Sequence, residues 1–126
     1  MREAISTPKA PAAIGPYSQA VRSGDTVWLS GQIALDPETM TLVGTTAAEQ
    51  ATQVLKNLGA VLEAAQCSFE NVVLCTIFLT DMDDFASVNE VYASFMADPP
   101  PARATVEVSR LPKDVRVEIS AVARDL

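Results

Sequence analysis

The apolar run VVLCTIFL, residues 72–79, constrains the fold of this 126-residue chain more than any other stretch. Its β-branched and aromatic residues favour a strand. A strand with one wet face alternates apolar and polar residues, and this run does not, so both of its faces should be covered. The run is also far shorter than the about 20 apolar residues that a membrane-spanning helix needs. We therefore expect a buried strand covered by protein on both sides, and no membrane partner.

Two amphipathic helices are predicted around this strand. Over residues 46–66 apolar residues recur every three or four positions, and Thr46 with Glu49 forms a capping-box pattern that sets the start. A second apolar stripe predicts a helix over residues 84–97, which the prolines that follow bring to an end. The acidic stretch at 81–84 is interpreted as capping of this helix rather than as a set of metal ligands.

Strand patterns occupy much of the remaining chain. They cover residues 3–6, 18–33 with a turn at 23–25, 71–80, 103–109 and 115–123. The order is three strands, a helix, a strand, a helix and two strands, which predicts one α+β domain over residues 1–126. We expect a mixed six-stranded sheet with both helices on one face. Since the helices cover only that face, a second copy of the same chain is the economical cover for the other, and we expect a homo-oligomer.

Two opposite charges, Arg103 and Glu118, stand in otherwise strand-like stretches. Side chains two apart on a strand share a face, which sets Arg103 opposite Val106 and Glu118 opposite Ile119. If the apolar residues meet the helices, both charges lie on the face away from them, where a neighbouring subunit would cover them. A charged pair there costs free energy unless it is hydrogen-bonded, and a bound ligand can supply the missing hydrogen bonds. The alternative is a structural pairing of charges between strands.

The charge balance and the absence of histidine argue against several classes of function. The net charge is −7 and the nine Lys and Arg residues are scattered, which argues against a nucleic-acid partner. Without histidine the chain has no Ser-His-Asp or Cys-His nucleophile and lacks the usual zinc ligand. Cys67 and Cys75 are interpreted as small apolar residues rather than as a disulfide or metal ligands. The start of the chain has no apolar signal region, so we expect a cytoplasmic protein.

Five stretches carry a resemblance to a known family. They are AIGPYSQAV at 13–21, LSGQIALDPET at 29–39, NL at 57–58, TIFLTDMDDFASVNEVYASF at 76–95 and PARATVEVSRLPKDVRVEISAVA at 101–123. Together, and over nearly the whole chain, they resemble the RidA (YjgF) family of reactive-intermediate deaminases, which also carries the label L-PSP endoribonuclease. The resemblance implies a chorismate-mutase-like α+β fold in a homotrimer, with a central barrel and three clefts at the subunit interfaces.

The resemblance also implies the chemistry. Members of the family hydrolyse 2-aminoacrylate and related enamines and imines, such as 2-iminobutanoate and 2-iminopropanoate, which pyridoxal-phosphate dehydratases release. The products are 2-keto acids and ammonia. The family needs no metal and no cofactor, so the expected partners are a small 2-imino or 2-keto acid and further copies of the chain.

Carried over position by position, the resemblance nominates seven site residues. The family's carboxylate-binding arginine falls on Arg103, whose planar fork suits a carboxylate, and its acid falls on Glu118, which would activate or position water. Tyr17 would orient the substrate or donate a proton. The remaining substrate-binding candidates are Ser30, Gly31, Asn89 and Thr105.

Structural alternatives stay open for most of these residues. Arg103 can pair with an acid across the strands, and Glu118 can neutralise Arg116 or Lys113. A tyrosine is also a common interface anchor, a glycine can serve a strand-end turn, and an asparagine can be a helix-surface amide. Trp28, Tyr92 and Phe95 are interpreted as core or interface packing residues.

The chain departs from the family pattern in two places. Thr105 stands where a cysteine is common, which excludes thiol modification there. The link from Met96 to Arg103 is shorter than usual, and Pro100 replaces an aromatic residue, so the substrate range can differ. Two other functions remain as alternatives: a non-catalytic protein that binds 2-keto acids, and an endoribonuclease, which the negative charge and the lack of histidine disfavour.

Overall fold

Helix α1 (Ala47–Ala64) begins where the capping box predicts. The Thr46 hydroxyl accepts a hydrogen bond from the Glu49 N–H at 3.2 Å, and the Glu49 carboxylate accepts one from the Thr46 N–H at 3.1 Å. These reciprocal bonds satisfy N–H groups that a helix start would leave without partners. The predicted apolar stripe is buried; its fully buried members include Val54, Leu55, Leu58, Val61 and Leu62.

The computed structural model describes residues 1–125 and contains one six-stranded sheet. The strands are β1 (Arg2–Ile5), β2 (Ala20–Ser23), β3 (Thr26–Gln32), β4 (Val72–Leu79), β5 (Ala102–Glu107) and β6 (Val117–Arg124). Their order across the sheet is β1-β2-β3-β6-β4-β5. All neighbours are antiparallel except β4 and β5, which are parallel. The predicted mixed six-stranded α+β fold is therefore confirmed.

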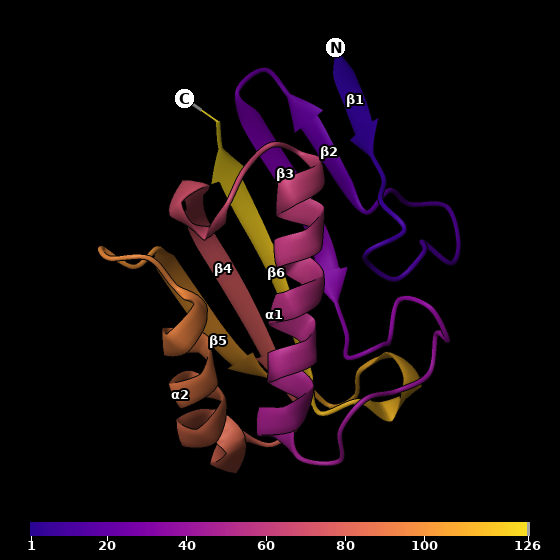
Figure 1. Cartoon of the computed structure of the whole chain (residues 1–126). Helices are drawn as coiled ribbons and strands as arrows, with labels where there is room; N and C mark the ends of the chain where they lie inside the picture. Colours follow the sequence, from indigo (N-terminus) through magenta and orange to yellow (C-terminus); the bar gives the residue numbers. More distant parts are fainter. Residues whose placement is uncertain (126) are drawn as a thin grey trace.

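Both helices cover the same face of this sheet (Figure 1). Helix α2 (Phe85–Phe95) lies beside α1 and over the β5 edge, and it ends slightly before the residues that the apolar stripe suggested. A short 3₁₀ turn, Met82–Asp84, leads into α2, and the Asp81 carboxylate accepts a hydrogen bond from the Asp83 N–H at 2.9 Å. Asp81 therefore caps this turn, but the predicted capping of α2 itself is not found, because the Asp84 side chain at its start makes no capping hydrogen bond.

The core lies between the sheet and the two helices. The central strands β4 and β6 send alternate side chains into it, among them Cys75, Ile77, Leu79, Val117 and Ile119. The opposite side of the sheet, which we call the open face, carries Trp28, Leu74, Phe78, Val106 and Val122 by strand register. Trp28 is 54% exposed, Leu74 39% and Val106 41%. The described part of the chain therefore covers only one face of β4. This agrees with the expectation that the two helices cover one face of the sheet and leave the other open.

The expectation that Arg103 and Glu118 share a face is wrong. Glu118 alternates with buried Val117 and Ile119 and lies on the open face as predicted, but Arg103 contacts α2 on the helix side. The reason is the position of β5 at the sheet edge. There α2 supplies aromatic rings and an amide that accept a guanidinium, whereas the apolar Val106 of the same strand faces the open side.

Candidate functional site

Arg103 is held on the helix side of β5 by one face of α2. Its guanidinium carbon lies 5.5 Å from the centroid of the Phe85 ring and 5.1 Å from that of Tyr92, within the range of cation–π attraction. One guanidinium nitrogen, Nη1, donates a hydrogen bond to Oδ1 of Asn89. The two rings and the amide orient the arginine and leave its remaining N–H groups for a ligand. The structure therefore brings the predicted residues Arg103 and Asn89 together.

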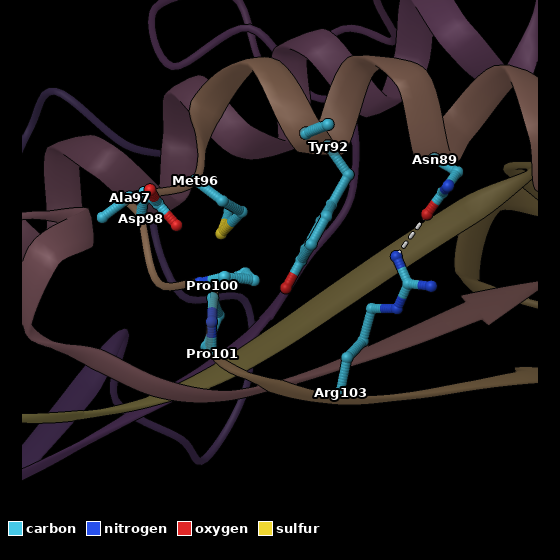
Figure 2. A pocket seen from close by; sticks show the side chains of 9 residues that line it. Asn89, Tyr92, Met96, Ala97, Asp98, Pro100, Pro101 and Arg103 are labelled. Atoms are coloured by element: carbon cyan, nitrogen blue, oxygen red, sulfur yellow. Dashed lines mark hydrogen bonds between the residues drawn. The ribbon is translucent and has the colours of Figure 1, made fainter.

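A cleft of about 590 Å³ opens beside this arginine, between α2 and the link into β5. Figure 2 shows Asn89 and Arg103 at one end of the cleft, Met96 and Pro100 at the other, and the Tyr92 ring between them. One end thus offers a cation and an amide, and the other is apolar apart from Asp98. Such a combination of a fixed charge and apolar walls suits a small organic anion.

Tyr92 is a site residue that the sequence reasoning missed. The residue is 5% exposed, yet it lines the cleft, and its hydroxyl has no hydrogen-bond partner among residues 1–125. The Cys75 thiol lies near it without the geometry of a hydrogen bond; burial first, and that thiol second, raise the pKa of Tyr92. Its place in the apolar stripe of α2 indicates only core packing. The one available signal was its spacing three residues after Asn89, which sets both on one side of the helix.

Glu118 lies half-buried on the open face and is isolated from other charges. Burial raises the pKa of its carboxyl group, and among the described residues it makes no hydrogen bond or ion pair. The alternative of a pairing with Arg116 is not realised, because that guanidinium donates to the Thr45 carbonyl at 3.1 Å and approaches Asp84 at 3.8 Å. An unpaired carboxylate of this kind is available to a ligand or to water.

Gly31 is placed directly against this carboxyl group. The register between β3 and β6 shifts between Leu29 and Gln32, and the irregularity presents Gly31 to Glu118. A Cβ atom built on Gly31 would lie 2.9 Å from Cδ of Glu118 and closer still to Oε2. The predicted residues Gly31 and Glu118 are therefore adjacent, and the glycine is what gives the carboxylate its space.

Tyr17 and Ser30 lie on the part of the sheet away from Arg103. The Ser30 hydroxyl donates to the Ser18 carbonyl at 2.6 Å, so its only donor is already used and it can meet a ligand only as an acceptor. Tyr17 is 52% exposed and lines a hollow of about 570 Å³ with Ala4 and Val21, the latter paired with Trp28 on the open face. Tyr17 thus belongs to the Glu118 side of the sheet.

The structure places Thr105 next to Arg103 and Asn89, with which it lines one small gap. It shares the helix side of β5 with Arg103, and its buried hydroxyl oxygen has no partner in the described part of the chain. The gap that it lines, against Phe85 and Val88, has no room for a water molecule. No group of three or more His, Cys, Asp or Glu side chains that could hold a metal ion occurs within residues 1–125. Within the same residues, no helix is long and apolar enough to cross a membrane.

Comparison with known proteins agrees with this architecture. Residues 7–125 match the family model described as Endoribonuclease L-PSP. The 2-iminobutanoate/2-iminopropanoate deaminase of Mus musculus is 53% identical over 123 residues, which cover 98% of this chain and 91% of that protein. The crystal structure of RidA from the Antarctic bacterium Psychrobacter sp. has a TM-score of 0.93 and 48% identity, covering 97% of this chain and 98% of that one.

A third relative has a small molecule in its structure. E. coli TdcF with bound serine superimposes with a TM-score of 0.91 and 42% identity, covering 97% of this chain and 98% of that one. With its matched length, its fold and the arrangement of its motifs, this chain belongs to the RidA/L-PSP endoribonuclease family.

Proposed function

We propose that this protein is a cofactor-independent deaminase that hydrolyses small 2-imino acids, such as 2-iminobutanoate and 2-iminopropanoate, to 2-keto acids and ammonia. The observation that carries the proposal is the guanidinium of Arg103, oriented by Asn89 and two rings at the edge of a 590 Å³ cleft. A planar fork held in this way suits the planar carboxylate of a 2-imino acid. The deaminase name of the murine relative supports the same substrate class.

The reaction adds water across a C=N bond. Glu118 takes a proton from water while the water oxygen bonds to the imine carbon, and the imine nitrogen gains a proton. The C–N bond of the resulting carbinolamine then breaks, the hydroxyl group loses its proton to become the keto oxygen, and ammonia leaves. A carboxyl group whose pKa is raised by burial is suited to accept and return that proton.

One chain cannot supply both groups to one small substrate. Arg103 lies on the helix side of β5 and Glu118 on the open face of β6, so the sheet itself stands between them. We propose that the site is completed at the junction of two copies, with Arg103 and Asn89 from one copy and Glu118, Gly31 and Tyr17 from the next. The exposed apolar residues of the open face support an assembly, which we propose to be a homotrimer.

The test couples the protein to a pyridoxal-phosphate dehydratase that generates 2-aminoacrylate from serine. Addition of this protein should accelerate the appearance of pyruvate, and Arg103→Ala and Glu118→Gln should each abolish the acceleration while the assembly stays intact. Unchanged pyruvate release with the wild type, or full activity of Arg103→Ala, contradicts the proposal.

A second candidate is a non-catalytic protein that binds small carboxylates. The serine bound to E. coli TdcF favours it, because a relative of this chain holds an amino acid in its structure. The same experiment separates the two functions. A carboxylate-binding protein would bind 2-oxobutanoate through Arg103 and leave the rate of imine hydrolysis unchanged.

A further inference from the structure

Tyr92 lines the cleft beside Arg103 and carries a buried hydroxyl group whose hydrogen-bonding capacity is unused. Tyr92 is 5% exposed, and its hydroxyl has no partner within residues 1–125. A buried polar group without a partner is costly, and such groups in native proteins call for an explanation. Core packing does not supply one here, because phenylalanine would fill the same space without the cost.

The surroundings of the hydroxyl limit what the partner can be. The Tyr92 side chain points from α2 toward the strands and ends between Arg103 and the proline link (Figure 2). The guanidinium carbon of Arg103 lies 5.1 Å from its ring centroid. Burial and the neighbouring Cys75 keep the pKa of the phenol above its ordinary value, so the group is a hydroxyl that can donate. A donor beside a guanidinium matches an anion.

We propose that Tyr92 is a further substrate-binding residue, whose hydroxyl donates a hydrogen bond to the carboxylate that Arg103 binds. This inference rests on the proposed function for the identity of the anion, a 2-imino or 2-keto acid. Arg103 supplies the charge, Asn89 fixes the position of the guanidinium, and Tyr92 adds a directional neutral donor from the opposite wall. The apolar end of the cleft near Met96 then takes the side chain of the acid.

The direct test is Tyr92→Phe, which keeps the ring and removes only the hydroxyl. We expect the Kd for 2-oxobutanoate, measured by calorimetry, to rise about tenfold or more, because a hydrogen bond to a charged group is lost. We expect the melting temperature of the ligand-free protein to stay the same or rise, because an unpartnered buried hydroxyl is removed. A structural role would instead lower the melting temperature and leave the Kd unchanged.

Cys75→Ala is the matched control. It removes the thiol beside the same hydroxyl without touching the cleft lining, and the Kd should stay within twofold of wild type. A Tyr92→Phe protein with the wild-type Kd overturns the proposal. So does an equal loss of affinity in Cys75→Ala, which would trace the effect to packing.

A measurement on the unsubstituted chain keeps the proposal testable if Tyr92→Phe fails to fold. The chain has two tyrosines, so 3-fluorotyrosine labelling gives two ¹⁹F signals, which Tyr17→Phe assigns. Addition of 2-oxobutanoate should shift the Tyr92 signal, and a Tyr92 signal unmoved at saturation overturns the proposal. These binding tests do not depend on turnover: a protein that binds through Tyr92 but hydrolyses no imine would refute the proposed function alone.

Discussion

Arg103 on β5 and Glu118 on β6 project from opposite sides of one sheet, with only β4 between their strands. A site that uses both groups on one small molecule must draw them from two chains. We expect Arg103→Ala and Glu118→Gln to be inactive alone and to regain activity when the two proteins are unfolded and refolded together. In a random equal mixture, about half of the junctions receive an intact Arg103 from one neighbour, and about half of those receive an intact Glu118 from the other. About a quarter of the sites would therefore be restored.

The control for this experiment is a chain that carries both substitutions, refolded with either single variant. In this mixture one of the two residues is replaced in every chain. No junction can therefore combine an intact Arg103 with an intact Glu118. The rate of keto acid formation should stay at background. Recovery in the control, or no recovery in the test mixture despite mixed assemblies, contradicts a site shared between copies.

Gly31 provides a prediction on the geometry of the acid. Its backbone does not have a positive φ, so Gly31→Ala adds only a methyl group, which collides with the Glu118 carboxyl group 2.9 Å away. We expect a loss of turnover of about tenfold or more, because the Glu118 side chain must move aside, and a destabilisation of at most about 1–3 kcal/mol, the range of overpacking. Chemical denaturation and steady-state kinetics measure both effects.

A double-mutant cycle identifies the cause of that destabilisation. In Glu118→Ala the space above Gly31 is empty, so the added methyl group of Gly31→Ala should cost far less free energy of unfolding in that background. Equal costs in the two backgrounds would show that the methyl group collides with something else.

The raised pKa of Glu118 sets the pH dependence of both activity and stability. The proposed reaction uses Glu118 as the ionised carboxylate, so activity should fall as the pH drops through the raised pKa. For stability the sign is opposite: the folded protein binds this proton more tightly than the unfolded chain, so the free energy of unfolding falls as the pH rises through the same window. Glu118→Gln should therefore melt at a higher temperature than wild type at pH 7.

The same comparison at about pH 4, below the raised pKa, tests the explanation. There the wild-type carboxyl group is largely protonated and resembles the amide, so the two melting temperatures should converge. A constant difference at both pH values would attribute the stabilisation to something other than the buried charge.

The open face makes a prediction about assembly. Leu74 is 39% exposed on that face, in line with the apolar residues of the neighbouring strands, and Leu74→Glu would bury a charge in any contact formed there. Sedimentation should show a smaller species, and keto acid formation should fall with it. Leu42→Glu is the matched control, since Leu42 is 45% exposed outside the sheet and should leave the sedimentation unchanged.

Local patterns were enough to predict most of the fold. The capping box at Thr46, the apolar stripe of α1 and the run at 72–79 each have one physical interpretation, and the turn after Ser23 needs the positive φ that Gly24 adopts. These signals depend on neighbours in the chain. They can therefore be interpreted without knowledge of the tertiary contacts.

The side of the sheet that Arg103 occupies did not follow from its pattern. Strand alternation sorts residues into two sets but does not say which set meets the helices, and on the edge strand β5 side chains of both sets are largely exposed. Tyr92 was missed for a related reason. A buried aromatic residue in a helix stripe has the same spacing whether its hydroxyl ends in the core or in a cleft, and only the fold separates the two cases.

The sheet acts as a partition, and this has a consequence at low protein concentration. If chains of the proposed assembly separate on dilution, each one keeps Arg103, Asn89 and the cleft beside them, but it loses the acid that the proposed site takes from its neighbour. Hydrolysis would then fall more steeply than in proportion to the amount of protein, by mass action, while part of the affinity for carboxylates remains. The dispersed chain would hold its ligand without consuming it.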